Sequence, residues 1–306
     1  MISLILPFEV AVMSQFFPSV CSTHLTRYSF VFLMLMTYSI LGWCGEMIYC
    51  SIGQRKLCEK RGFLNGPICP IYGHGALVVL LCLDGGCENP VFTFFWGAIL
   101  TSIVEYMTSF VMEKLFHMRW WDYSRYRFHI NGRVCLLNST LFGLASVFLC
   151  HFANPPIAGW LTALFDIRLA VPLALALTAV YLADIVLSVR SAIQIGDRLT
   201  KLHAIHDELA VKLEELKLEQ QQAVETQKQK LEELIQEPQQ AIETQRQRLE
   251  TRRAALRQAA EQKLHALYTR QDFFERRLLH SFPTLRSARH PEALSKLKEY
   301  LENRKK

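Results

Sequence analysis

Three acidic residues stand inside long apolar runs of this sequence: Glu46, Glu105 and Asp184. Ionisable side chains within membrane-spanning segments are costly, usually face the protein interior, and mark functional sites by default. Burial disfavours the charged form of a carboxyl unless a cation is paired with it. These carboxyls are therefore the first candidates for a functional site, and Arg61 or Arg133 is the cation we expect beside one of them.

Each of five apolar runs places a polar residue at a similar depth, counted from the end that the loop charges assign to the cytoplasm. At about 1.5 Å per residue, that depth is roughly 6–12 Å below the inner boundary. We expect these side chains to converge around a cytoplasm-facing vestibule. The alternative is that Glu46 and Asp184 reach the headgroups separately by snorkelling. The candidate vestibule residues are Glu46, His74, Glu105, Asn138, Ser139 and Asp184.

A second candidate feature is a run of fifteen residues, 61–75, that contains four glycines and two prolines at the entry to an apolar run. Such a composition indicates a specifically shaped backbone. Unwound backbone at membrane depth is tolerated where it lines a cavity. The alternative is a structural turn whose small residues allow close helix packing. The candidate loop residues are Arg61, Gly62, Asn65, Gly66, Pro67, Cys69, Pro70, Tyr72 and Gly73.

An aromatic and basic segment follows the third apolar run. Trp and Tyr favour the level of the lipid headgroups, so an interfacial anchor is one interpretation. The other is a surface that binds a partner or a ligand. Its candidate residues are Trp120, Trp121, Asp122, Tyr123 and Arg133.

The elements that must position these residues are membrane-spanning helices, each of which needs about 20 apolar residues. The second run is short and is expected to be partly re-entrant or held inside the bundle. Residues 156–165 are too short to span and are expected in the outer interface. Residues 1–20 suggest an interfacial helix or, alternatively, a sixth span. The five predicted spans are 28–50, 67–83, 90–113, 134–152 and 169–189.

The basic residues alternate between loops as the positive-inside rule requires for five spans. The first and third loops are basic, the second has no Lys or Arg, and the segment after residue 189 is basic again. This predicts a multi-pass protein of the plasma membrane, with the start of the first main span outside and the C-terminal region in the cytoplasm. The formal charge of +6 is thus attributed to topology and to the lipid bilayer, and nucleic-acid binding is not expected.

From about residue 190 the sequence is dominated by charged residues, Gln, Ala and Leu. Ala, Leu, Glu, Gln, Lys and Arg are all good helix formers. Leucines 202, 209 and 216 recur every seven residues, as do Ile235, Ile242, Leu249 and Leu256. Heptad spacing predicts a coiled-coil arm, and one strong apolar residue per heptad predicts weak pairing.

An internal repeat extends this arm. Residues 221–232 read QQAVETQKQKLE and residues 239–250 read QQAIETQRQRLE. The offset of 18 residues is about five helical turns, so both copies present the same face. Pro238 lies between the copies, where it would either kink one long helix or begin the second helix of an antiparallel hairpin.

Together these patterns predict an all-α fold: a polytopic membrane helix bundle with a long C-terminal cytoplasmic helical arm. Four regions are expected: 1–27, an interfacial or extra membrane segment; 28–189, the transmembrane domain; 190–282, the arm; and 283–306, a short helical tail. The nine cysteines form no CxxC pair, and no phosphate-binding loop of the G-x-x-x-x-G-K-[ST] type occurs. We expect no metal, no cofactor and no catalytic residue.

Several strings in this order resemble a known bacterial membrane family. They are Gly42-Trp43 with Glu46, the string from Arg61 to Pro67, the string from Cys69 to Gly73, residues 121–124 and Gly132-Arg133. They are similar to the CmpB-like ABC-transporter permeases over about residues 28–152. The string Arg276-Arg277-Leu278-Leu279 with Phe282-Pro283 is similar as well. Residues 125–129 depart from the family pattern, and the Gln-rich repeat is an embellishment.

The resemblance implies a permease-like transporter subunit that uses a separate ATPase subunit or another energy source. A different class of function is a membrane-anchored scaffold or regulator that binds other proteins through its arm, and a homo-oligomer is compatible with either. An intramembrane enzyme using Glu46 or Glu105 is the least favoured hypothesis, because no nucleophile or metal set accompanies them.

Overall fold

The computed structural model describes residues 18–19, 21–54, 62–83, 89–166, 168–233, 239–269 and 273–303. The chain divides into two compact units, Met1–Ile193 with Phe274–Ala288, and Gln194–Phe273 with Arg289–Lys306. The inclusion of Phe274–Ala288, hereafter the return segment, in the first unit is not predicted by composition.

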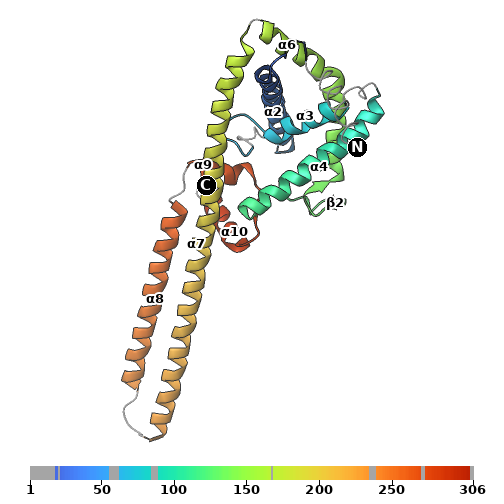
Figure 1. Cartoon of the computed structure of the whole chain (residues 1–306). Coiled ribbons are helices and arrows are strands. Elements are labelled where there is room, and N and C mark those ends of the chain that lie inside the picture. The colour runs from blue at the N-terminus through green and yellow to red at the C-terminus, as the bar shows by residue number, and fades with distance from the viewer. Residues whose placement is uncertain are drawn as a thin grey trace, which may run out of the picture. The chain divides into compact units, whose positions relative to one another are not determined.

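The first unit consists mainly of helices (Figure 1). Two short antiparallel ribbons complete it, in which Met118 pairs with Ser287 and His129 pairs with Cys135. Its elements are α2 (His24–Gln54), α3 (Pro70–Leu83), α4 (Pro90–Phe116), β1 (Met118–Arg119), β2 (His129–Ile130), β3 (Val134–Cys135), α5 (Leu136–Phe148), the π-helix η1 (Leu149–Ala153), α6 (Asn154–Asp166), the start of α7 (Ala170–Glu233), α9 (Phe273–Ser281) and β4 (Arg286–Ser287).

Four described helical stretches are long and apolar enough to cross a membrane: His24–Ile52, Pro90–Phe116, Leu136–Asp166 and Ala170–Thr226. They correspond to four of the five predicted spans. The second predicted span forms only the 14-residue helix α3, which is shorter than a span needs. Residues 156–165 are not separate, because the π-helical turn η1 joins α6 to α5 in one 31-residue stretch. The predicted all-α, polytopic membrane helix bundle is confirmed.

Close helix contacts at glycines build this bundle. Helix α2 packs on α3, α3 on α4, and α4 on α5. A Cβ added at Gly42 would lie 2.2 Å from Cβ of Tyr72, and one at Gly73 would lie 2.5 Å from the carbonyl oxygen of Leu35. Small residues give apolar helices their tightest packing in the absence of a hydrophobic driving force in lipid. The glycines therefore set the distance between α2 and α3.

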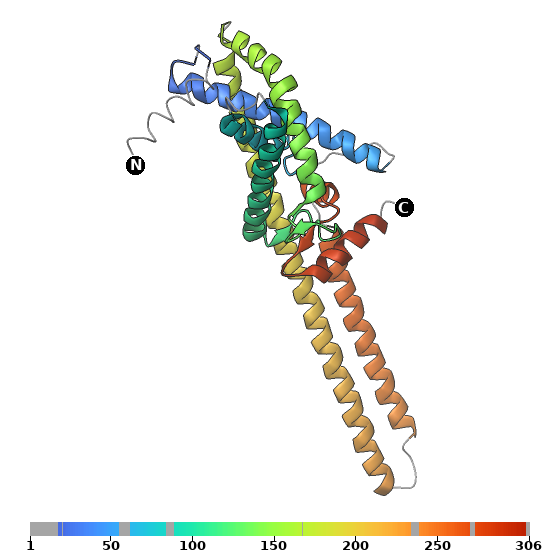
Figure 2. The ribbon, with the colours of Figure 1, turned by 90° about the vertical axis from the view of Figure 1, so that its right-hand side faces the viewer.

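The second unit contains α7 from Gln194 onward, α8 (Gln239–Thr269) and α10 (Pro291–Asn303). Helices α7 and α8 lie side by side and antiparallel (Figures 1 and 2). Leu202 and Leu216, predicted seam residues of α7, are buried. The antiparallel arrangement corresponds to the hairpin alternative, although Pro238 itself lies outside the described residues.

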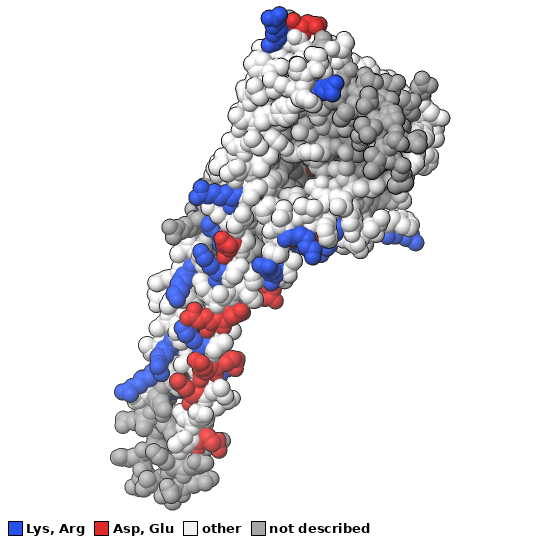
Figure 3. All heavy atoms as spheres, viewed as in Figure 1, with Lys and Arg blue, Asp and Glu red and all other residues white. Residues whose placement is uncertain are grey.

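The two units differ in surface chemistry. On the face drawn in Figure 3, the first unit is largely free of charged side chains, whereas the second carries Lys, Arg, Asp and Glu along its length. Large apolar side chains such as Val91, Phe95 and Ile103 of α4 are exposed on the first unit. An apolar exterior of this kind is expected of helices that face lipid.

Candidate functional site

The glycine- and proline-rich loop, residues 62–69, is held from one side by Asp184 of α7. Oδ1 of Asp184 accepts hydrogen bonds from the backbone N–H of Asn65 and from its side-chain amide, both at 2.8 Å. Oδ2 accepts the backbone N–H of Gly66 at 2.7 Å. Ser188, one turn further along α7, adds bonds to Asn65 and to Asp184 at 3.2 and 3.3 Å. The carboxylate thus satisfies backbone donors that the non-helical loop cannot pair internally.

A cation holds the same loop from the return segment. The guanidinium of Arg277 donates to three successive backbone carbonyls: Gly62 at 3.2 Å, Phe63 at 2.7 Å and Leu64 at 2.6 Å. Burial lowers the pKa of this guanidinium from its ordinary value, and the attraction of Asp184 opposes the shift. Gly62 adopts a φ of 105°, a backbone conformation that favours glycine. The loop therefore presents its carbonyls to a cation and its amides to an anion.

Aromatic rings pack between the loop and the return segment. The indole of Trp120 is only 2% exposed. It makes edge contacts with Phe63 of the loop, at 5.1 Å between ring centroids, and with Phe282 of the return segment, at 4.9 Å. Phe116, at the end of α4, completes the cluster. Trp120, predicted as an interfacial residue, thus lies inside the protein.

Asp122 fixes the segment that follows β1. Its carboxylate accepts hydrogen bonds from the backbone and hydroxyl of Ser124 at 3.0 and 2.6 Å, and it pairs with Arg286 of the return segment at 2.7 Å. Burial acts to raise the pKa of Asp122, but the bonds from Ser124 and the charges of Arg286 and Arg119 outweigh it and leave the pKa below its ordinary value. Asp122 is therefore an ionised anchor of the segment.

A second polar group, the carboxyl cluster, comprises Glu46, Tyr72, Glu105, Tyr123 and Asn138. The hydroxyl of Tyr72 on α3 donates to Oε2 of Glu46 on α2. The hydroxyl of Tyr123 donates to Oε1 of Glu105 on α4 at 3.1 Å, and the amide of Asn138 on α5 lies beside the same carboxyl. Burial raises the pKa of Tyr123, so this phenol stays a donor. Glu46 lies within electrostatic range of Glu105 and Tyr123.

The structure thus brings together three of the six candidate vestibule residues, Glu46, Glu105 and Asn138, and places the others elsewhere. Asp184 binds the loop. Ser139 is bonded to Ser102 at 2.8 Å. His74 is exposed, and its Nδ1 is 2.7 Å from the carbonyl oxygen of Pro70.

Arg133, one of the two predicted arginine partners, has its ion pair with a different carboxylate. Arg133 pairs with Glu113 at 3.0 Å and lies over the rings of Tyr106 and Phe110. Arg61 lies outside the described residues. Trp121 donates from its indole to the carbonyl of Arg133 at 3.0 Å. Of the remaining loop candidates, Pro67 and Cys69 lie just before α3, Pro70 begins this helix and Gly73 lies in its first turn.

Sequence reasoning missed Arg277 and Arg286 as site residues. The string around Arg277 carries a family resemblance, but nothing in its charge or spacing indicates a contact with residues more than 200 positions away. A buried arginine in a stretch of mixed charge looks the same in sequence as a solvated one.

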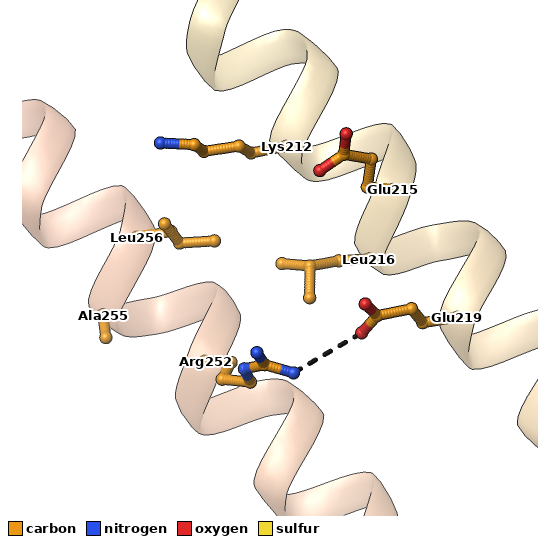
Figure 4. Close-up of a pocket in the computed structure, with 7 residues that line it drawn as sticks. All are labelled: Lys212, Glu215, Leu216, Glu219, Arg252, Ala255 and Leu256. Carbon is orange, nitrogen blue, oxygen red and sulfur yellow. Dashed lines mark ion pairs between the residues drawn. The ribbon is translucent and has the colours of Figure 1, made fainter.

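A groove lies between the two long helices of the second unit. Its volume is about 360 Å³, and α7 and α8 both line it (Figure 4). Arg252 and Glu219 form an ion pair at 3.6 Å at its edge, with both side chains more than half exposed. Its lining residues are Lys212, Glu215, Leu216, Glu219, Arg252, Ala255 and Leu256. Among the described residues, no group of three or more His, Cys, Asp or Glu side chains could hold a metal ion.

The family model described as "Putative ABC-transporter type IV" matches residues 33–189. The chain belongs to this family. The match confirms the CmpB-like resemblance. It covers the candidate spans Pro90–Phe116 and Leu136–Asp166 completely and the other two in part, together with the glycine- and proline-rich loop, Asp184 and the whole carboxyl cluster. It ends before the second unit and the return segment. No curated protein and no solved structure matches the chain.

Proposed function

We propose that this chain is the membrane-spanning, permease-like subunit of a transporter and that a separate chain supplies the ATPase. The observation that supports this most is that the family match spans the apolar helices together with both polar groups between them. The sequence has no phosphate-binding loop with which to bind a nucleotide of its own.

In this proposal the carboxyl cluster lies on the path of the solute or coupling ion. Its residues come from α2, α3, α4 and α5 and from the segment after β1, so a change in the packing of any of these elements would alter it. Buried ionisable groups at helix interfaces commonly lie on such pathways.

We further propose that the protein lies in the plasma membrane, with the loop around Cys58 and the C-terminal hairpin in the cytoplasm. The basic loops favour this orientation. Labelling of intact cells with an impermeant thiol reagent should modify Cys87 and spare Cys58, two residues that lie outside the described ranges. Strong labelling of Cys58 from outside would reverse the orientation.

The alternative is a membrane-anchored scaffold that binds partners through the hairpin of α7 and α8. The groove between these helices and the mixed charge of their exposed faces favour it. This reading assigns no transport role to the first unit.

Affinity purification from native membranes separates the two functions. The full chain is compared with a variant in which residues 213–259 are replaced by a short Gly-Ser turn. A permease subunit should recover an ATPase subunit with the full chain. A scaffold should recover other proteins with the full chain, lose them with the shortened hairpin, and recover no ATPase with either. The last result would refute the permease proposal.

A further inference from the structure

The carboxyl of Glu105 has an incomplete set of partners at a buried position. The residue is 4% exposed. Oε1 accepts the hydrogen bond of Tyr123 at 3.1 Å. Oε2 is inaccessible to solvent, and no donor among the described residues meets it with hydrogen-bond geometry, although the amide of Asn138 lies beside the carboxyl. A buried polar atom left without a partner is uncommon in folded proteins and calls for a specific explanation.

No cation in the described part of the chain compensates a charge on this carboxyl. Four arginines of the first unit are engaged elsewhere: Arg119 and Arg133 with Glu113, Arg286 with Asp122, and Arg277 with the loop carbonyls. The ionisable side chain whose charge acts on Glu105 is Glu46, another carboxyl. Two carboxylates in one apolar site repel each other, and burying either without a cation costs several kcal/mol.

The geometry identifies what can complete the site. Because Oε2 is sealed from solvent in this state, a hydrated ion or an organic solute does not reach it. A proton needs no cavity, and it removes the charge that makes burial costly. Tyr123 already donates to Oε1, so Oε1 acts as the carbonyl oxygen and Oε2 is the atom left to carry the proton.

We propose that Glu105 is a proton-binding site, at which one exchangeable proton resides on Oε2 while Tyr123 and Asn138 position the carboxyl. Glu46 is the second carboxyl of the site, and its own oxygen is bonded by Tyr72. Tyr123 belongs to the segment anchored by Asp122, so a displacement of that segment would withdraw the donor from Oε1. Proton release would then be linked to a change in the packing of the first unit. The proposal deepens the proposed transport function, but its test requires neither a substrate nor an ATPase.

Infrared spectroscopy of the full chain in lipid nanodiscs tests this directly. A neutral carboxylic acid has a carbonyl stretching band that is well separated from the bands of a carboxylate. At neutral pH the wild-type protein should show this band, and Glu105→Gln should lose it. Glu113→Gln is the matched control on the same helix, because Glu113 is paired with two arginines and should contribute no such band. Absence of the band in the wild type, or its survival in Glu105→Gln, would overturn the proposal.

Three further measurements test the position and exchange of the proton. Tyr123→Phe removes the donor to Oε1, so the band should remain and move to higher frequency. An unchanged frequency would contradict the assignment of the proton to Oε2. Transfer to heavy water should shift the band, and raising the pH should convert it to carboxylate bands. A band that responds to neither change would show a fixed structural acid and would refute an exchangeable proton.

Discussion

The loop at residues 62–69 and the carboxyl cluster are both polar, and both lie in a unit with an apolar exterior. They differ in how their charged groups are paired. In the loop each charge meets groups of opposite polarity: the guanidinium of Arg277 meets carbonyls, and the carboxylate of Asp184 meets amides. Oδ1 of Asn65 and Nε of Arg277 have no hydrogen-bond partner among the described residues, but neither leaves a buried charge without compensation. In the cluster, each of two carboxyls accepts a hydrogen bond from its own tyrosine, no cation compensates Glu105, and one oxygen of Glu105 has no hydrogen-bond partner among the described residues.

From this difference we infer a structural role for the loop and a functional role for the carboxyl cluster. A buried charge that is matched by several hydrogen bonds has little to gain from moving, and breaking those bonds leaves buried groups unpaired. A buried carboxyl oxygen without a hydrogen-bond partner can bind or release a proton at modest cost, because no existing hydrogen bond has to be broken. We infer that the loop is a fixed joint between α2, α3, α7 and the return segment, and that the cluster is the part that changes state.

The largest effect is expected from Arg277→Met, which removes the donor of three loop carbonyls while keeping a long side chain. Each buried acceptor left unpaired costs about 1–3 kcal/mol, so a loss of about 3 kcal/mol or more is expected. Thermal unfolding of the purified chain in detergent measures it. Arg276→Met, at an exposed neighbouring position, is the control and should change the midpoint little.

If both arginine variants unfold alike, the guanidinium does not hold the loop, and the contrast between a fixed joint and a variable cluster fails.

An intermediate effect is expected from Gly42→Ala. The added Cβ would lie 2.2 Å from Cβ of Tyr72, so α2 and α3 must move apart. Overpacking of this kind costs about 1–3 kcal/mol. It also displaces the tyrosine that binds Glu46. Gly45→Ala, three residues along the same helix, has no atom within 4 Å of the new Cβ and should be neutral or slightly stabilising. Equal effects in thermal unfolding would contradict the close contact.

The smallest effect is a pH dependence in the second unit, which must be separated from that of Glu105. Burial, followed by the charge of Lys296, lowers the pKa of His206, and burial, followed by His203, lowers that of His290. The unfolded histidines bind protons from about pH 6.5 downward. The folded unit binds them only at lower pH, so its stability is complete above about pH 6.5 and falls as the pH falls.

Hydrogen exchange of α10 in the full chain, corrected for intrinsic rates, should therefore show weaker protection below this pH than above it. His290→Gln should reduce the dependence. Protection that strengthens on acidification would reverse the sign of the argument.

The sequence predicted the elements better than the contacts. Apolar runs and loop charges locate four spans, because length and hydropathy are properties of each segment by itself. The same reasoning found Glu46, Glu105 and Asn138, since depth along a helix is set by its rise per residue. The same reasoning could not show that Asp184 lies apart from these three residues. Equal depth does not fix the direction of a side chain around the helix axis, and Asp184 binds the loop.

The return segment could not be predicted at all. Its binding to the first unit depends on Arg277, Arg286 and Phe282 meeting partners contributed by segments far away in sequence. Composition places these residues in the charged region, where they look solvated. Likewise, Pro238 left two arrangements open, and only the pairing of α7 with α8 favours one.

The most direct test of the contrast between the two polar groups applies one chemical change to both. Asp184→Asn and Glu105→Gln each replace a carboxyl by an amide of nearly the same size within a candidate span. Asp184 accepts bonds from two backbone N–H groups at different oxygens, so an amide must turn a donor toward one of them. Glu105 loses only a proton-binding group.

Thermal unfolding of the two variants beside the wild type, in the same lipid or detergent, gives the answer. We predict a midpoint lowered by the equivalent of about 2–3 kcal/mol in Asp184→Asn and a midpoint close to wild type in Glu105→Gln. Equal midpoints, or a greater loss in Glu105→Gln, would contradict the assignment of the loop as the fixed joint and of the cluster as the variable site.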